Sequence, residues 1–238
     1  MSLRASFIQR MIPTRHPSWK EFAAKVGGEF RANRFWRSDE VVTQLGDWEV
    51  HLDTVMLDPE TGAPHTDLRT GAPAPGLHFS TRRGTQVWAN FTSIDGFRFV
   101  IRDRQALHRN PWGLQWDIDV GRLIDKAKSR LGVEDVEVGH PDFDDRFTVR
   151  TNDPAKLRNL FDSSILEQVM RCPDLAEIRI DSEPVDGAVP RAATMLIWRR
   201  LMTHDVEELV DFHELILGLL DRLANQGSAA PFIQPPSN

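Results

Sequence analysis

Residues 134–182 read EDVEVGHPDFDDRFTVRTNDPAKLRNLFDSSILEQVMRCPDLAEIRIDS. Within this stretch, apolar and polar side chains alternate over residues 147–151, which is the period of a half-buried strand. Asp153 can then accept a backbone N–H bond as a helix N-cap, and Pro154 suits the first helical position because it has no N–H to leave unpaired. The stretch therefore predicts a strand that leads directly into a helix.

The second half of the stretch repeats this logic. The first helix is expected to break at Asp162 and Ser163, after which Ser164 and Glu167 predict a capping box for a second short helix. Residues 176–181 alternate once more between apolar and polar side chains, which predicts another strand. The predicted unit is strand, helix, helix, strand.

The same stretch carries a resemblance to known sequences. Phe143, an acid, two further residues, Phe147 and Val149, followed by the acidic turn at Asp153 and a leucine-bearing helix, resemble a pattern in uncharacterised bacterial domain-of-unknown-function families. The resemblance covers residues 143–161. It implies a bacterial origin and a protein without catalytic activity, and it assigns a role to no residue.

Two hairpins are expected upstream of this unit. A strand at 41–45 and a strand at 48–57 flank Gly46-Asp47, which is a plausible two-residue turn. Strands at 85–92 and 97–103 are expected to pair across Asp95-Gly96, a strong hairpin signal. Consecutive hairpins predict an antiparallel sheet.

Amphipathic helices are expected at both ends of the chain, at residues 17–33 and at 203–226. His213 lies on the apolar stripe of the second of these and is expected to be a hydrogen-bonded core residue. The fold class is α+β: a large antiparallel sheet of about seven or eight strands, with the long C-terminal helix and the helix pair 154–171 packed on one face. This arrangement is expected to create an apolar pocket or a concave face.

The expected domain organisation has three parts. Residues 1–15 form a basic amphipathic arm, residues 16–227 form one α+β domain, with a possible division into two halves near residue 133, and residues 228–238 form a disordered tail.

Composition excludes several classes of protein. The 238 residues carry a net charge of −6, which argues against wholesale binding of nucleic acid. The single cysteine, Cys172, allows no internal disulfide, and this fits a cytoplasmic protein. No apolar run approaches the roughly 20 residues of a membrane span.

Two groups of side chains are candidate metal ligands. His51 and Asp53 lie two residues apart on a predicted strand and so share one face, where they could chelate a metal or form an acid–base pair. Asp142 and Asp144 belong to the acidic cluster 142–145, which suits calcium or magnesium. The alternatives are a solvated sheet face for the first group and a turn with capping aspartates for the second.

Candidate ligand-binding or partner-binding residues are Trp112, Trp116, Arg98 and Arg102. The two tryptophans lie in irregular chain, where they are either an exposed contact or lids over the sheet. The arginines could hold an anion, or pair across the sheet with the acids around His51.

No catalytic residue or cofactor motif emerges from the sequence. The leading hypothesis is a non-catalytic bacterial binding protein for a protein partner or a small apolar ligand. The first alternative is a metal-dependent hydrolase that uses His51 and Asp53 or the 142–145 cluster. The second is a peripheral membrane factor that uses residues 1–15.

Overall fold

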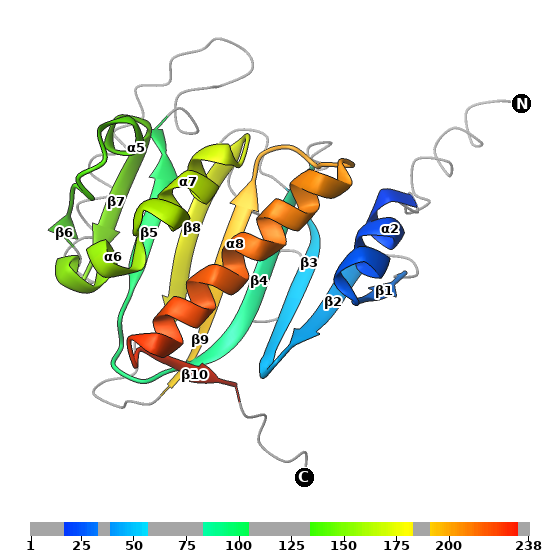
Figure 1. Cartoon of the computed structure of the whole chain (residues 1–238), viewed down its shortest axis with the longest axis horizontal. Coiled ribbons are helices and arrows are strands. Elements are labelled where there is room, and N and C mark those ends of the chain that lie inside the picture. Colours follow the sequence, from blue (N-terminus) through cyan, green and yellow to red (C-terminus); the bar gives the residue numbers. More distant parts are fainter. Residues whose placement is uncertain (1–16, 33–38, 57–82, 105–133, 183–190, 233–238) are drawn as a thin grey trace, which may run out of the picture.

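The computed structural model describes residues 17–32, 39–56, 83–104, 134–182 and 191–232. The ten strands in these ranges form a single antiparallel sheet with the order β1-β2-β3-β4-β9-β8-β5-β7-β6, and β10 pairs with β4 (Figure 1). The strands are β1 (Glu29–Arg31), β2 (Glu40–Leu45), β3 (Trp48–Met56), β4 (Arg83–Ser93), β5 (Phe99–Asp103), β6 (Glu134–Asp135), β7 (Phe147–Thr151), β8 (Leu175–Ser182), β9 (Arg191–Arg199) and β10 (Ala229–Pro231).

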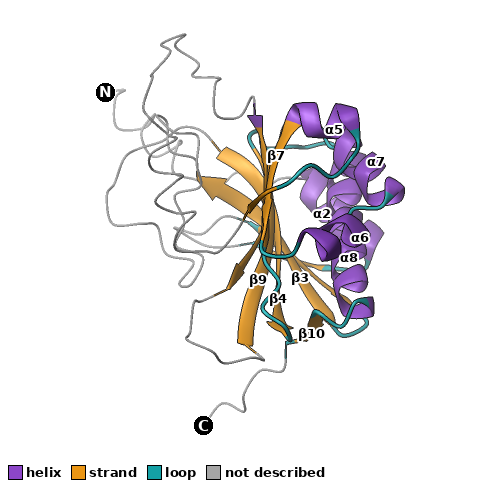
Figure 2. Ribbon diagram, turned by 90° about the vertical axis from the view of Figure 1, so that its left-hand side faces the viewer, coloured by secondary structure: helices purple, strands orange, loops and turns teal. Residues whose placement is uncertain are grey.

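The helices of the described ranges all lie on one side of the sheet (Figure 2). They are α2 (Pro17–Val26), α5 (Pro141–Arg146), α6 (Pro154–Leu160), α7 (Ser163–Arg171) and α8 (Val206–Asn225). The α+β class, the large antiparallel sheet, the long C-terminal helix and the helix pair on one face are confirmed. The count of ten strands exceeds the prediction because β1, β6 and β10 are only two or three residues long.

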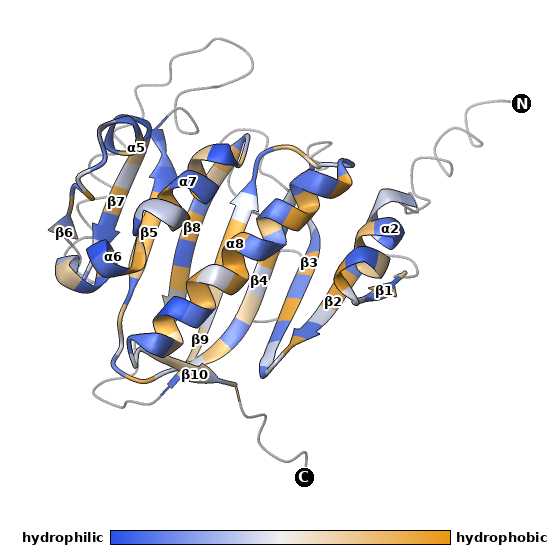
Figure 3. Ribbon diagram, viewed as in Figure 1, coloured by the Kyte–Doolittle hydropathy of each residue, from blue (hydrophilic) through white to orange (hydrophobic). Residues whose placement is uncertain are grey.

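The main core fills the space between the sheet and its helices. Strand side chains such as Val50, Leu52 and Ile178 pack in one cluster with Leu215 and Leu219 of α8. The alternation of hydropathy along β3 and β8 can be followed in Figure 3. Because successive side chains of a strand point to opposite faces, every second residue of each strand is left on the side without helices.

The strand-helix-helix-strand unit of residues 147–182 is present as β7, α6, α7 and β8. The Asp153 side chain caps α6 by accepting from the Lys156 N–H at 3.0 Å, as expected. The expected capping box of α7 is wrong: Asp162 is the N-cap and accepts from the Ile165 N–H at 3.0 Å. The cap moves upstream because Asp162 is already extended and starts the helix two residues earlier than Ser164 would.

The first predicted hairpin is confirmed and the second is wrong. Leu45 pairs with Trp48 across the turn between β2 and β3. Strands β4 and β5 do not pair: β4 lies between β3 and β9, and β5 lies between β7 and β8. Both hydrogen-bonding edges of β4 are thus occupied by other strands, and the Asp95-Gly96 segment carries the chain across the sheet instead of folding it back.

The helix predicted over residues 17–33 is shorter than expected. Helix α2 ends at Val26, Gly27 has a positive φ of 69°, and the Gly28 N–H donates to the Ala23 carbonyl at 2.8 Å. A Cβ atom at Gly28 would lie 2.6 Å from Cγ2 of Thr43 on β2, so only glycine permits this approach. The glycine pair therefore ends the helix and starts strand β1.

The predicted disordered tail also needs correction. Residues Ala229–Pro231 form β10 and pair with Phe91–Ser93 of β4. β10 continues the position of β3 along the same edge of β4, beyond the point where β3 turns away. The arm 1–15 and the expected division near residue 133 lie outside the described residues.

Candidate binding site on the distal face of the sheet

We call the side of the sheet that carries no described helix the distal face. It includes the side chains of β3, β4 and β9 that alternate with the core residues. These are Glu49, His51, Asp53, Val55, Gln86, Trp88, Asn90, Thr194, Leu196 and Trp198. Their placement follows from the register, because residues paired on neighbouring strands share a face.

Two rows of side chains cross the distal face at right angles to the strands. The first row is Arg31, Glu40, Asp53, Gln86, Trp198, Glu177 and Arg102. The second row is Val42, His51, Trp88, Leu196, Arg179 and Val100. Residues far apart in the sequence therefore meet as direct neighbours.

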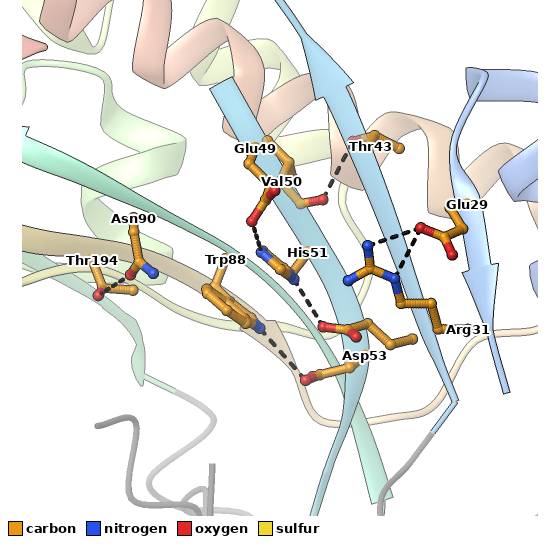
Figure 4. Close-up of polar contacts among 11 residues, drawn as sticks. Glu29, Arg31, Thr43, Glu49, Val50, His51, Asp53, Trp88, Asn90 and Thr194 are labelled. Atoms are coloured by element: carbon orange, nitrogen blue, oxygen red, sulfur yellow. Dashed lines mark hydrogen bonds and ion pairs between the residues drawn. The ribbon is translucent and has the colours of Figure 1, made fainter. Parts of the chain in front are cut away.

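His51 is the centre of a polar cluster at the β2–β3 end of these rows (Figure 4). Its Nδ1 lies 2.8 Å from Oε1 of Glu40, and its Nε2 lies 2.9 Å from Oε1 of Glu49. The imidazole also stacks on the indole of Trp88, with ring centroids 3.9 Å apart and planes 3° from parallel. A neutral imidazole carries one N–H, so only the imidazolium donates to both carboxylates.

The electrostatics agree with this geometry. The His51 side chain is only 11% exposed, and burial lowers its pKa. The hydrogen bonds and charges of Glu40 and Glu49 outweigh burial, so the pKa of His51 is raised above its ordinary value. The cluster holds a positive ring between two negative groups.

Asp53 lies on the same side of β3, but its surroundings favour the neutral form and not the charged one. Burial raises the pKa of its carboxyl to about 7, although the Gln86 amide and the Trp88 indole favour the charged form. The Trp88 Nε1–H points at Oδ2 from 3.5 Å, which is a long contact. Among the described residues, Oδ1 of Asp53 accepts no hydrogen bond.

An apolar cluster lies in the middle of the distal face. Val55, Ala176, Leu196 and Trp198 are at most 5% exposed, and the partly buried Trp88 packs against them. This cluster is separate from the core beneath the helices. Buried apolar side chains on a face without a described helix distinguish this region from an ordinary solvated sheet face.

An ion-pair group flanks the apolar cluster on its other side. Glu177 of β8 accepts from Arg102 Nε and, at 3.0 Å, from Arg179. Pairing with the acids around His51 was one of two possibilities for Arg102, and the structure contradicts it. Strands β4, β9 and β8 separate β5 from β3, so the arginine meets Glu177 instead.

The remaining candidate residues lie elsewhere. The backbone N–H of Arg98, just before β5, donates to Asn152 Oδ1 at 2.8 Å. Asp142 is exposed on the short helix α5, while both carboxylate oxygens of Asp144 accept from the Val138 and Gly139 N–H groups at 2.9 Å. This is the capping-turn alternative. Trp112 and Trp116 lie outside the described residues.

Within the described ranges, no three or more His, Cys, Asp or Glu side chains are grouped to hold a metal ion. The metal assignments at His51, Asp53, Asp142 and Asp144 stay predictions. In the same ranges no helix has the length and apolar character needed to cross a membrane.

Sequence reasoning selected His51 and Asp53 for this region and missed Glu40, Gln86 and Trp198. The spacing of two on a strand was sufficient to find the first pair. The others lie on β2, β4 and β9, and only the register of these strands brings them to Asp53.

Comparison with models of protein families gives no match, and comparison with curated proteins gives none either. Both results agree with the resemblance of residues 143–161 to families without an assigned activity. Among solved structures, the chain is similar to the crystal structure of the mycobacterial trehalose monomycolate transport factor A. The TM-score is 0.43 and the sequence identity 10%, over 90% of this chain and 96% of that one.

Proposed function

We propose that this is a non-catalytic bacterial binding protein that takes a small, mainly apolar ligand on the distal face. The observation that carries the proposal is the apolar cluster of Val55, Ala176, Leu196 and Trp198, which is buried on the side of the sheet without a described helix. Ligand sites are typically apolar, with a few polar groups placed at the edge. Here the His51 cluster and the Glu177 ion pairs provide such an edge.

The arrangement of His51 favours binding over hydrolysis. A general base or a metal ligand needs a free nitrogen lone pair, and both ring nitrogens of His51 face carboxylates. Its protonated state supports a structural role that fixes Trp88 against the apolar cluster. A bacterial, cytoplasmic setting belongs to the same proposal and is supported by the resemblance of residues 143–161 and by the free, buried thiol of Cys172.

The proposal is tested with the neutral fluorescent probe N-phenyl-1-naphthylamine. We expect saturable binding by the wild-type protein and at least tenfold weaker binding by Leu196→Ala, because the substitution removes apolar contact area from the distal face. Ile197→Ala is the matched control: it is the next residue of β9, equally buried, and points into the helix-side core.

Both variants are destabilised, so binding is compared at a temperature at which circular dichroism shows each of them folded. Unchanged affinity in Ile197→Ala together with weakened affinity in Leu196→Ala supports the distal face as the site. Absence of saturable binding by the wild-type protein, or equal weakening in the two variants, contradicts the proposal.

A further inference from the structure

Three polar atoms in the first row of the distal face have no hydrogen-bond partner in the part of the chain that the structure describes. They are Oδ1 of Asp53, Oε1 of Gln86 and Nε1 of Trp198. Gln86 is 4% exposed and Trp198 is 5% exposed, so water reaches neither side chain freely. Buried polar groups in proteins are nearly always paired, and an unpaired set needs an explanation.

The three atoms are neighbours. Asp53 pairs with Gln86 across β3 and β4, and Gln86 pairs with Trp198 across β4 and β9. Side chains at directly opposed positions start about 5 Å apart, so one small group can contact members of all three strands. The row borders the apolar cluster directly, because Trp198 belongs to both.

The kinds of atom in the row define what would satisfy it. Oε1 of Gln86 is an acceptor and the indole N–H of Trp198 can only donate, whereas Oδ1 of a neutral Asp53 carboxyl can either accept or donate. An ammonium group has donors but no acceptor, and it would leave Trp198 unpaired. A carboxylate has acceptors only, and it would leave Oε1 of Gln86 unpaired. A hydroxyl group donates and accepts at once, and two adjacent hydroxyls match all three atoms.

Charge along the row also favours a neutral ligand. Glu40 lies next to Asp53, and Glu177 lies next to Trp198, so an anion would meet a carboxylate at each side. Burial keeps the Asp53 carboxyl largely uncharged below about pH 7, which weakens the attraction for a cation. Both glutamates disfavour an anion, while their ion pairs with His51, Arg102 and Arg179 leave little net charge to attract a cation.

We propose that Asp53, Gln86 and Trp198 recognise the paired hydroxyls of a neutral aliphatic 1,2-diol, whose hydrocarbon chain lies on Trp88 and Leu196. This inference rests on the proposed function, since it names the class of ligand for the same face. Each hydroxyl would form ordinary hydrogen bonds with the row, and the hydrocarbon chain would contact the apolar cluster already described.

The test compares 1,2-decanediol with 1,2-dimethoxydecane by isothermal titration calorimetry. Both compounds have the same chain and the same oxygens, but the ether cannot donate. We expect the wild-type protein to prefer the diol at least tenfold. Gln86→Met should reduce this preference to less than about threefold while the affinity for the ether stays the same, because only the diol donates to Oε1 and Met keeps a side chain of similar size. Trp198→Phe should weaken the binding of both compounds alike, because the oxygens of both accept from the indole N–H.

Trp48→Phe is the matched control. It removes an indole N–H that donates to Asp221 on the helix side at 3.2 Å, so the affinities for the diol and for the ether should both persist. Equal binding of diol and ether by the wild-type protein, or a preference that survives in Gln86→Met, overturns the diol assignment and leaves the proposed function standing. Binding of neither compound overturns the diol assignment, and the naphthylamine measurement decides the proposed function separately. A fall in affinity in Trp48→Phe equal to that in Trp198→Phe also overturns the assignment.

Discussion

The imidazole of His51 and the indole of Trp88 lie parallel across neighbouring strands, 3.9 Å apart. His51 is fixed in this position by carboxylates at both of its nitrogens, which makes the stacked ring a cation over an aromatic face. The pair joins the charged end of the distal face to its apolar centre. The first of four predictions tests the charge on His51. The other three concern the buried or ion-paired groups Asp53, His213 and Asp95.

The first prediction concerns His51→Gln. The pKa of His51 is raised in the folded protein, so the ring stabilises the fold fully below its unfolded pKa near 6.5. This contribution is lost as the pH rises through the folded pKa. Urea unfolding should show wild type more stable than His51→Gln by about 1 kcal/mol at pH 6, with a smaller difference at pH 9. A difference that does not change with pH would contradict the imidazolium assignment.

The second prediction concerns Asp53→Asn. Burial raises the pKa of Asp53 to about 7, so the folded state retains a proton that the unfolded state releases near pH 4. The contribution of Asp53 to the stability of wild type should fall as the pH rises from 4 to 7, by up to about 4 kcal/mol. Asp53→Asn cannot ionise, so its advantage over wild type should grow across the same window. Carbon-13 NMR of the Asp53 carboxyl provides an independent reading, and a midpoint near 4 would contradict the prediction.

The third prediction concerns His213 in the core. It shares a 2.7 Å hydrogen bond with Thr43 and meets the Phe22 ring edge-on, and burial lowers its pKa to about 4. Folding therefore opposes protonation, and stability is lost as the pH falls below 6.5. Between pH 6.5 and 4.5 the loss should be about 2–3 kcal/mol, and His213→Leu should lack it. Equal acid sensitivity of the two proteins in urea unfolding would argue against this.

The fourth prediction concerns Asp95, which connects three segments. It accepts from the Phe97 N–H at 2.9 Å and from the Ser228 hydroxyl at 2.7 Å, and it forms an ion pair with Lys156. Burial raises the pKa of Asp95, but these donors outweigh it and the pKa is lowered. Its stabilising contribution is therefore present above about pH 4 and is lost as the pH falls through the lowered value.

Asp95→Ala should lower stability at pH 7 by about 1–2 kcal/mol and speed hydrogen exchange in β10, because Ser228 directly precedes that strand. Asp145→Ala, which changes an exposed aspartate of α5, is the control and should leave exchange in β10 unchanged. Protection of β10 equal to wild type in Asp95→Ala would show that the strand does not depend on this contact.

Local features were predictable from the sequence because they depend on neighbours in the chain. The alternation at residues 147–151, the cap at Asp153 and the amphipathic stripe of α8 act within a few residues, and all three are present. His51 and Asp53 were found for the same reason, since residues two apart on a strand share a face. Where local signals competed, at Asp162 and at Gly27, the cap and the helix end were misplaced.

Strand order and the composition of the distal face were decided only in three dimensions. Asp95-Gly96 has the local chemistry of a hairpin turn, but β4 pairs with β3, β9 and β10, whose edges are available only in the assembled sheet. Likewise, Gln86 and Trp198 reach Asp53 through the register of strands that lie far apart in the sequence. Hydrogen bonds between strands join backbone N–H and C=O groups, which are the same in every strand. The sequence of one strand therefore does not specify its partner. That choice is made when the apolar faces of all strands are buried together.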